Sequence, residues 1–464
     1  MKIYRLFCLL LSICIVTCGL GMVNAEQSTN LSVISGCRGM DSAVPMLGNA
    51  QLVENVEAAV LYELQTDTLM YTWNADAQIY PAGLVKILTA LLVIENGNLT
   101  DAVTVRESVL DTVSKDSRTS KLQVDEVLTL EQLVYCILVE GSNDASAVAA
   151  DHVAGSQEAF ISMMNQYVEQ IGCTSSVFTN VHGLHNDAQV SSAKDIAKIL
   201  AAAMKNETFA QIFGTTYYEL EKTNKSESRS MESGNHLMHK GLYEIYYDSR
   251  ITGGRTGADY RGYRSVATTA EYNGVQMLCV VIGCQSEVTD YGYVKKIGGF
   301  GETSDLLDVA FDGYRTAHIL YDGQALKQYG VVNGICDVVV GPKVNISSVV
   351  PENQETDPLT YRYNEINGAL VAPIEKDQRV ATVEIWSGSV CIAQTDLFAL
   401  NQVQVAYGQI EDRGNGLRFW HVALIVVLSL IILCGAGLIV VRFYNMKKAD
   451  ARKKSKTLRK RRGR

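Results

Sequence analysis

A run of 20 residues without a charge, Val422 to Val441, constrains this chain more than any other feature. About 20 residues of helix cross the hydrocarbon core of a bilayer, so the run predicts a transmembrane helix. Trp420 stands just before it, where an aromatic ring anchors a span at the membrane interface. The sequence therefore predicts a protein whose body folds outside the bilayer and is attached through its C-terminal end.

The segment after this run, residues 442–464, has twelve Lys or Arg residues and one acid, Asp450, and so carries +11. Such a tail can bind nucleic acid. We favour a cytoplasmic flank under the positive-inside rule, in contact with anionic lipid headgroups. The net charge of the whole chain is −9, so the other 441 residues carry −20. An acidic body argues against nucleic-acid binding.

The N-terminus has two basic residues, a long apolar core and a small-residue site that ends at Ala25. This pattern predicts a secretory signal peptide over residues 1–25. A lipoprotein site at Cys18 is a weaker alternative, because Thr17 is larger than the small residue expected there. Together the two ends predict a single-pass protein of the cell membrane, with an extracellular ectodomain and a cytoplasmic tail.

Between the ends, the apolar pattern is first that of an α+β domain and then that of short alternating strands. We expect the following segments: signal peptide 1–25, lead-in 26–50, α+β domain 51–321, all-β domain 322–405, linker 406–421, transmembrane helix 422–441 and basic tail 442–464. The composition, 47% hydrophobic and 20% charged, is that of a globular protein.

Several local signals place elements within the α+β domain. Leu84–Glu95 is apolar on nearly all sides, which predicts a central buried helix. Thr129 with Gln132 is a capping-box pattern, and Asn273-Gly274 between two β-rich runs predicts a tight hairpin. The segment Thr303 to Tyr321 is expected to form a closing helix.

Seven of the eleven cysteines lie outside the predicted signal peptide and span: Cys37, Cys136, Cys173, Cys279, Cys284, Cys336 and Cys391. An odd, scattered set is no disulfide framework, and most are expected to be buried thiols. Cys279 and Cys284 fall five apart in one expected strand, so they face opposite sides and should not pair.

Three short stretches occur in order along the chain: "AGLVK", "GSND" and "GGRTGA". Together they resemble the S-x-x-K, S-x-N and K-T-G motifs of penicillin-binding proteins. The sequence is most similar to the D-alanyl-D-alanine carboxypeptidase family, whose first motif "PAGLVKILTAL" matches throughout except at the serine. "NVHGLHNDAQV" also resembles a family segment, and the likeness covers about residues 45–405.

The resemblance implies a β-lactamase/D,D-peptidase-like domain, with an antiparallel sheet and flanking helices, followed by a β-rich C-terminal domain. It implies serine-type cleavage of D-Ala-D-Ala ends of peptidoglycan stem peptides. In such a site a serine three residues before a lysine lies on the same helix face, and the desolvated lysine activates it. The third motif binds the substrate carboxylate, and backbone N–H groups form an oxyanion hole.

This chain departs from the pattern at three positions. The nucleophile position is Gly83, the first serine of S-x-N is Gly141, and the lysine of K-T-G is Arg255. Four residues of the family pattern remain: Lys86, Asn143, Thr256 and Gly257. Ser142 stands in the middle position of the second motif.

Gly83 decides the prediction, because acyl-enzyme chemistry needs a nucleophile and no serine occurs between Ser42 and Ser108. Arg255 stays cationic and is able to grip a carboxylate, whereas Ser142 could replace the second-motif serine from the neighbouring position. A snorkelling role for Lys86 is rejected because its helix is apolar all round.

We therefore predict a catalytically impaired, membrane-anchored family member that binds stem peptides, a β-lactam-like ligand or a wall partner. The pocket would be formed by Gly83, Lys86, Ser142 and Asn143 on the catalytic side and Arg255, Thr256 and Gly257 on the substrate side. One alternative is an active carboxypeptidase with a lysine-activated water, and another is a protein-interaction scaffold with a vestigial cleft. No cofactor is expected, and His182 with His185 lacks the further ligands that a metal needs.

Overall fold

The computed structural model describes residues 40–41, 45–48, 50–241, 244–288, 294–352, 359–365, 368–388, 390–406 and 415–461. The predicted signal peptide and Cys37 lie outside these residues, as do residues 407–414 of the predicted linker. Contacts along the chain divide it into two compact units. The larger runs to Gln324 and includes Gly341–Ile366 and Arg379–Leu397, and the smaller comprises Ala325–Val340, Asn367–Gln378 and Phe398–Arg464.

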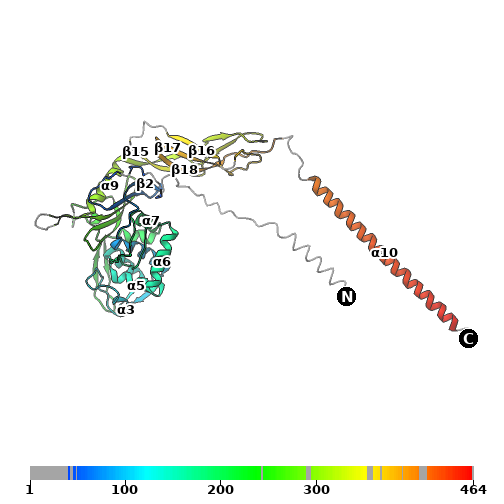
Figure 1. Cartoon of the computed structure of the whole chain (residues 1–464), viewed down its shortest axis with the longest axis horizontal. Coiled ribbons are helices and arrows are strands. Elements are labelled where there is room, and N and C mark those ends of the chain that lie inside the picture. The colour runs from blue at the N-terminus through cyan, green and yellow to red at the C-terminus, as the bar shows by residue number, and fades with distance from the viewer. Residues whose placement is uncertain are drawn as a thin grey trace. The chain divides into compact units, whose positions relative to one another are not determined.

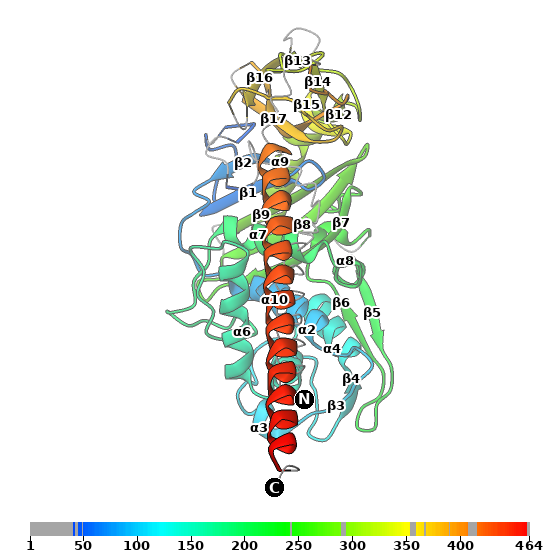
Figure 2. The same ribbon diagram turned by 90° about the vertical axis from the view of Figure 1, so that its right-hand side faces the viewer.

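An antiparallel five-stranded sheet forms the centre of the larger unit, in the order β2-β1-β9-β8-β7 (Figure 2). Its strands are β1 (Ala58–Glu63), β2 (Thr68–Trp73), β7 (Ile251–Ala258), β8 (Arg264–Tyr272) and β9 (Val275–Cys284). The predicted hairpin at Asn273-Gly274 is confirmed: it joins β8 to β9, and both turn residues have positive φ, 51° and 78°.

Helices and short ladders surround this sheet. The helical segments are η1 (Ala82–Leu84), α2 (Val85–Asn96), α3 (Glu107–Leu110), α4 (Leu130–Tyr135), the π-helical η2 (Cys136–Glu140), α5 (Asn143–Ala154), α6 (Gln157–Gln170), α7 (Ala193–Ala203), α8 (Glu207–Phe213), η3 (His236–Met238) and α9 (Phe300–Gly313). The ladders pair β3 (Ala102–Thr104) with β4 (Val127–Thr129), β5 (Tyr217–Leu220) with β6 (Arg229–Glu232), and β10 (Glu287–Val288) with β11 (Val294–Lys296).

Side chains alternate between the two faces of the sheet, and each face is apolar. Val60 and Val280 belong to the core on the α2 side, whereas Leu61 and Val281 belong to the core that includes α9. Helix α7 contacts β1 and β9, and α9 contacts β8 and β9. Because both faces are covered, the central strands are buried over most of their length.

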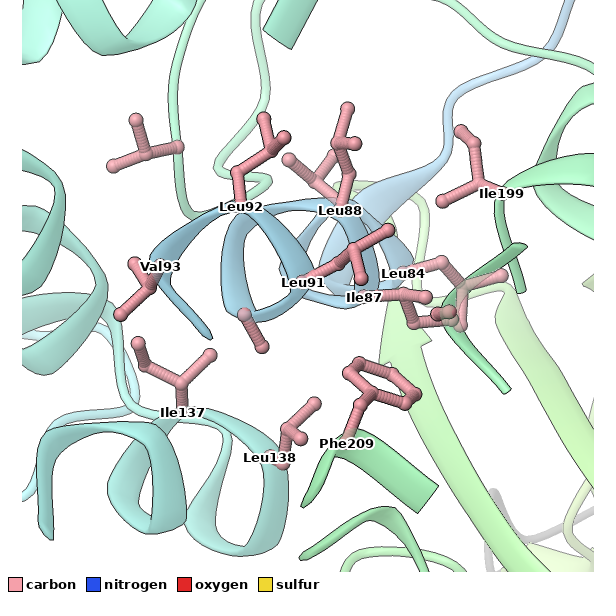
Figure 3. Packing of buried hydrophobic residues seen from close by; sticks show 14 of the residues in the cluster. Leu84, Ile87, Leu88, Leu91, Leu92, Val93, Ile137, Leu138, Ile199 and Phe209 are labelled. Atoms are coloured by element: carbon pink, nitrogen blue, oxygen red, sulfur yellow. The ribbon is translucent and has the colours of Figure 1, made fainter. Parts of the chain in front are cut away.

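Helix α2 is buried on all sides, as predicted, with every residue from Val85 to Val93 inside the core. Figure 3 shows its leucines packed against Ile137, Ile199 and Phe209, which come from η2, α7 and α8. Truncating one such leucine to alanine costs about 2–5 kcal/mol. The helix that carries Lys86 is therefore held rigidly by its apolar neighbours.

Two other local predictions concern helix ends. The capping box is confirmed: the Thr129 side chain accepts a hydrogen bond from the backbone N–H of Gln132, and the Gln132 side chain accepts one from the backbone N–H of Thr129. The predicted closing helix over Thr303 to Tyr321 is wrong in its second half. Helix α9 ends at Gly313, and Tyr314–Leu320 forms strand β12, because a glycine stops the helix before an alternating run rich in β-formers.

The C-terminal β region contains two sheets. Strand β12 pairs with β15, and a five-stranded sheet has the order β13-β14-β18-β17-β16. Their bounds are β13 (Lys327–Tyr329), β14 (Val338–Gly341), β15 (Ile346–Pro351), β16 (Thr360–Glu365), β17 (Arg379–Ser387) and β18 (Val390–Ala399). This all-β region after a sheet with flanking helices confirms the predicted fold class, whereas the domain boundaries stay predictions.

The chain then forms α10 (Asn415–Arg461), drawn in Figure 1 as one continuous helix. Within the described residues, it contains one stretch long and apolar enough to cross a membrane, Ala423–Lys448, by length and composition. Among the cysteines, Cys136, Cys279 and Cys284 are buried free thiols, Cys173 is partly buried, and Cys336 and Cys434 are exposed. Cys391 is disulfide-bonded, which the odd cysteine count did not predict.

Candidate active site

Four separate parts of the chain supply most of the lining of one pocket of about 340 Å³. They are the η1–α2 turn, the η2–α5 junction, strand β7 and the turn that contains His182. Six of the seven predicted site residues line it: Gly83, Lys86, Asn143, Arg255, Thr256 and Gly257. The three motifs, which lie between residues 82 and 258, are thus parts of one site in the folded chain.

Lys86 is buried in this pocket, with 2% of its surface exposed. Its Nζ donates a hydrogen bond to the backbone carbonyl of His182. Burial lowers the pKa of Lys86 well below its ordinary value, and the charges of Arg255 and Arg118 lower it further. An amine with such a lowered pKa is able to accept a proton, which is the task of the lysine in a serine-lysine pair.

Gly83 lies against strand β7, and the space for a side chain there is small. A Cβ atom at position 83 would lie 3.0 Å from the carbonyl oxygen of Thr256 and 3.1 Å from Cα of Gly257. The approach is reciprocal, since a Cβ at position 257 would overlap the backbone nitrogen of Gly83 and lie 2.9 Å from its Cα. The backbone of β7 therefore closes much of the room that a nucleophile side chain would need.

At Gly141, the space for a side chain is occupied by another side chain. Its φ is +82°, and a Cβ there would overlap the guanidinium of Arg255, with 2.6 Å to Cζ and 2.8 Å to Nη1. Arg255 Nη1 donates to the carbonyl oxygen of Leu138 at 3.3 Å. The arginine at the lysine position of the third motif thus occupies the place of the missing side chain of the second motif.

The guanidinium of Arg255 is 5% exposed, and its Nε has no hydrogen-bond partner. Burial lowers the pKa of Arg255 to about 9, Arg118 adds to the shift, and Glu140 opposes it. At neutral pH the group is still protonated. A buried cation with an unused donor favours an anionic ligand in the pocket.

Ser142 has a different environment from its neighbours in the motif. It is fully buried and does not line the pocket. Its Oγ donates to the carboxylate of Asp144 and accepts a hydrogen bond from the backbone N–H of Ser120 at 2.6 Å. These bonds hold the loop before β4 against the start of α5, so the geometry argues against Ser142 as a replacement for the second-motif serine.

Besides His182, sequence reasoning missed three polar side chains that line the pocket, Ser117, Arg118 and Arg264. Arg264 is opposite Ala258 in the β7–β8 pairing, so the hairpin register could have revealed it. Arg118 forms an ion pair with Glu140 at 3.1 Å, and Ser117 Oγ donates to the carbonyl of Ser114 at 2.6 Å. No sequence pattern marks these two loop residues, because only the fold brings the loop to the cleft.

His182 is buried at the back of the pocket. Burial and the charge of Lys86 lower its pKa to about 4, so the ring is neutral at pH 7. Its Nδ1 accepts a hydrogen bond from the backbone N–H of Leu184 at 3.2 Å. In the described part of the chain, no group of three or more His, Cys, Asp or Glu side chains is arranged to hold a metal ion.

A second pocket of about 260 Å³ shares Gly183, Leu184 and Ala258 with the first. Its walls include the rings of Tyr80 and Tyr260, whose centroids are 5.6 Å apart. The cleft therefore combines a cationic part with an aromatic part. Such a combination suits an extended ligand that has an anionic end and an apolar segment.

Comparisons with known proteins agree with this architecture. The family profile described as D-alanyl-D-alanine carboxypeptidase matches residues 49–286, and that of the penicillin-binding protein 5 C-terminal domain matches residues 314–405. The carboxypeptidase DacA of Haemophilus influenzae is 27% identical over 364 residues, covering 76% of this chain and 87% of the relative. DacF of Bacillus subtilis is 23% identical over 360 residues, covering 77% and 88%.

Solved structures share the fold. Penicillin-binding protein 5 from Haemophilus influenzae superposes with a TM-score of 0.63 at 24% identity, covering 77% of this chain and all of that one. A peptidoglycan synthesis regulatory factor (PBP3) from Streptococcus pneumoniae gives 0.59 at 19% identity, covering 75% and 99%. With its motif residues gathered in one pocket and a matching profile over half its length, this chain belongs to the D-alanyl-D-alanine carboxypeptidase family.

Proposed function

We propose that this protein is a catalytically impaired member of its family that binds peptides ending in D-Ala-D-Ala without cleaving them. The observation that carries the proposal is Gly83, at the position of the nucleophile, packed against the backbone of β7. Removing the nucleophile of such a constellation leaves only the contribution of binding and of the oxyanion hole.

Several features of the pocket support retained binding. Arg255 and Arg118 supply positive charge for a terminal carboxylate, and Thr256 lines the same wall. The aromatic pocket beside Tyr80 and Tyr260 offers an apolar surface for the preceding part of a stem peptide. Lys86, whose pKa burial lowers, takes part as a hydrogen-bonding group rather than as a base for a serine.

The test compares the unmodified protein with Gly83→Ser and with a triple variant, Gly83→Ser/Gly141→Ser/Arg255→Lys. Each is incubated with labelled penicillin, and D-alanine release from a pentapeptide is measured. We expect no covalent label on the unmodified protein. Gly83→Ser should label slowly, because β7 has to shift by a few tenths of an ångström, and the triple variant should label faster.

Binding is measured separately, by NMR titration with a D-Ala-D-Ala peptide, using Thr256→Val as a control of similar shape without the hydroxyl. We expect saturable binding that the control weakens several-fold. Absence of binding would favour the interaction scaffold. Release of D-alanine by the unmodified protein would establish an active carboxypeptidase, and mass spectrometry of any penicillin adduct would test Ser117 as its site.

We further propose that α10 anchors the protein in the cell membrane, with the ectodomain outside and the basic tail in the cytoplasm. The support is the apolar stretch Ala423–Lys448, followed by a tail rich in Lys and Arg. In intact cells, a membrane-impermeant reagent should modify a cysteine placed on the ectodomain and fail to modify one placed in the tail. Modification of the tail in intact cells would reverse this topology.

A further inference from the structure

In the described part of the smaller unit that precedes α10, three large aliphatic side chains are exposed to solvent. Val332, Ile335 and Val371 expose 50%, 60% and 55% of their surface. We call this set the apolar rim. Exposed aliphatic groups that gather at one place mark a surface that binds something, whereas single ones are ordinary.

Backbone hydrogen bonds hold the rim together. The N–H of Val332 donates to the carbonyl of Leu370 at 2.8 Å, and the N–H of Ala372 returns a bond to Val332 at 3.0 Å. Ile335 follows on the same loop, and its N–H donates to the carbonyl of Gln404 at 3.0 Å. The loop 331–336 is therefore fixed between residues 370–372 and residues 403–406.

The chain leaves its folded body beside this loop. Gly334 forms a β-bridge with Val405, and the N–H of Ala406 donates to the carbonyl of Asn333 at 2.8 Å. Residues 407–414 separate Ala406 from the first residue of α10. The nine steps from Ala406 to Asn415 span at most about 32 Å when fully extended, so the rim is tethered within that reach of the start of the helix.

The charge of these segments suits a lipid surface better than a charged partner. Residues 331–336, 370–374 and 403–406 contain no charged side chain, although the body as a whole is acidic. Asp337 borders the loop, and its Oδ2 accepts a hydrogen bond from Gln328 at 2.9 Å. Glu375, which is exposed, follows the segment 370–374. A neutral aliphatic loop bordered by these two acids is able to enter the headgroup region while the acids stay in water.

We propose that the apolar rim docks on the outer surface of the bilayer and fixes the orientation of the ectodomain above it. The proposal rests on the anchoring of the chain by α10. The covering partner is a lipid surface rather than a second protein, because the chain that continues toward the span leaves the body at the rim.

Two natural free cysteines allow a direct test on the full chain, since Cys336 adjoins the rim and Cys434 lies in the apolar stretch of α10. The full-length protein is placed in phosphatidylcholine–phosphatidylglycerol nanodiscs. A fluorophore is attached to Cys336 in Cys434→Ser, to Cys434 in Cys336→Ser, or to Lys225→Cys as a control on the larger unit. Mass spectrometry confirms each labelling site, and lipids with nitroxides in the headgroup or acyl chain quench the label.

We expect the headgroup nitroxide to quench the label at Cys336 at least twofold more than the label at the control site. The acyl-chain nitroxide should quench the label at Cys434. A Val332→Ser/Ile335→Ser/Val371→Ser variant should lose at least half of the quenching at Cys336 and keep that at Cys434.

The outcomes separate the two proposals. Quenching at Cys434 without quenching at Cys336 would overturn the docking of the rim and leave the anchor standing. No quenching at Cys434 would overturn the anchor and, with it, the inference. Efficient bismaleimide cross-linking of Cys336 between two copies, in place of lipid quenching, would assign the rim to a second copy and overturn the lipid assignment.

Discussion

Two serine positions of the family pattern are glycine in this chain, and the structure fills them in different ways. At Gly83 the backbone of β7 approaches until a Cβ would lie 3.0 Å from the Thr256 carbonyl. At Gly141 the guanidinium of Arg255 occupies the space. One position is closed by the backbone of the edge strand β7 and the other by the end of a flexible side chain.

This difference predicts how readily each position accepts a side chain again. Strand β7 is hydrogen-bonded to β8 along its length, so it moves only at a cost in backbone hydrogen bonds. An arginine side chain changes rotamer more easily, although here its guanidinium is buried. At Gly83, however, the neighbours have to yield by only a few tenths of an ångström, whereas a side chain at Gly141 is also strained by the φ of +82°. Position 83 should therefore accept a side chain more readily than position 141, and the stability of variants can test this ranking.

The largest expected effect is at Gly257, the partner of Gly83 in the close approach. Gly257→Ala forces a methyl group onto the backbone of Gly83, so we expect a loss of about 3 kcal/mol in the free energy of unfolding. Urea denaturation of the ectodomain measures it. Gly313→Ala is the control, since no atom lies within 4 Å of its Cβ position. Equal stabilities of the two variants would contradict the backbone closure.

The next effect concerns His182, whose carbonyl accepts the hydrogen bond from Lys86. Its pKa falls from 6.5 to about 4 on folding. Below pH 6.5 the unfolded chain therefore gains a proton that the folded protein takes up only near pH 4, and stability declines through that range. The loss at pH 5 is about 2 kcal/mol.

His182→Gln should remove this loss. When the pH is lowered from 7 to 5, we expect the unfolding free energy of this variant to fall by about 2 kcal/mol less than that of the unmodified protein. Denaturant titrations at both values measure the change, with His318→Gln on β12 as the control for removing a histidine elsewhere. If the unfolding free energy changed equally between pH 7 and pH 5 in this variant and in the unmodified protein, the His182 ring would take up its proton as readily in the folded protein as in the unfolded chain.

Much of the fold could be predicted from the sequence because local patterns determined it. The Asn273-Gly274 turn, the Thr129 cap and the all-apolar helix α2 each depend on residues close together in the chain. The error at Tyr314–Leu320 arose because helical periodicity on one side of Gly313 was extended across it. A glycine between two apolar segments marks a boundary more reliably than continued hydrophobicity does.

The site was less predictable, since its chemistry depends on contacts between distant residues. The sequence indicated that Arg255 remains a cation, but only the fold places it on Gly141, 114 positions earlier in the chain. Ser142 lies between two pocket residues in the sequence, yet its hydroxyl is buried and hydrogen-bonded to the Asp144 carboxylate and the Ser120 backbone N–H. Arg118 reaches the pocket from a loop that no motif describes.

The side-chain closure at Gly141 is tested by a double-mutant cycle with Arg255→Ala. Gly141→Ala alone combines strain at φ +82° with overlap of the guanidinium, whereas the same change in Arg255→Ala retains only the strain. We expect a coupling energy of about 1–2 kcal/mol. Gly155→Ala is a matched control, with φ +80° and no neighbour within 4 Å, and should show no coupling to Arg255.

The smallest effect is expected for Gly83→Ala. Its Cβ would lie 3.0 Å from the Thr256 carbonyl oxygen and 3.1 Å from Gly257 Cα, so neighbours have to yield by only a few tenths of an ångström. We expect a loss of about 1 kcal/mol in unfolding free energy, well below that of Gly257→Ala. Urea denaturation measures both in parallel. A loss as large as that of Gly257→Ala would mean that β7 cannot move at all, and that a serine at position 83 would not restore a working nucleophile. A gain in stability would mean instead that room for the nucleophile is still present, so that the proposed impairment would rest on the missing hydroxyl alone.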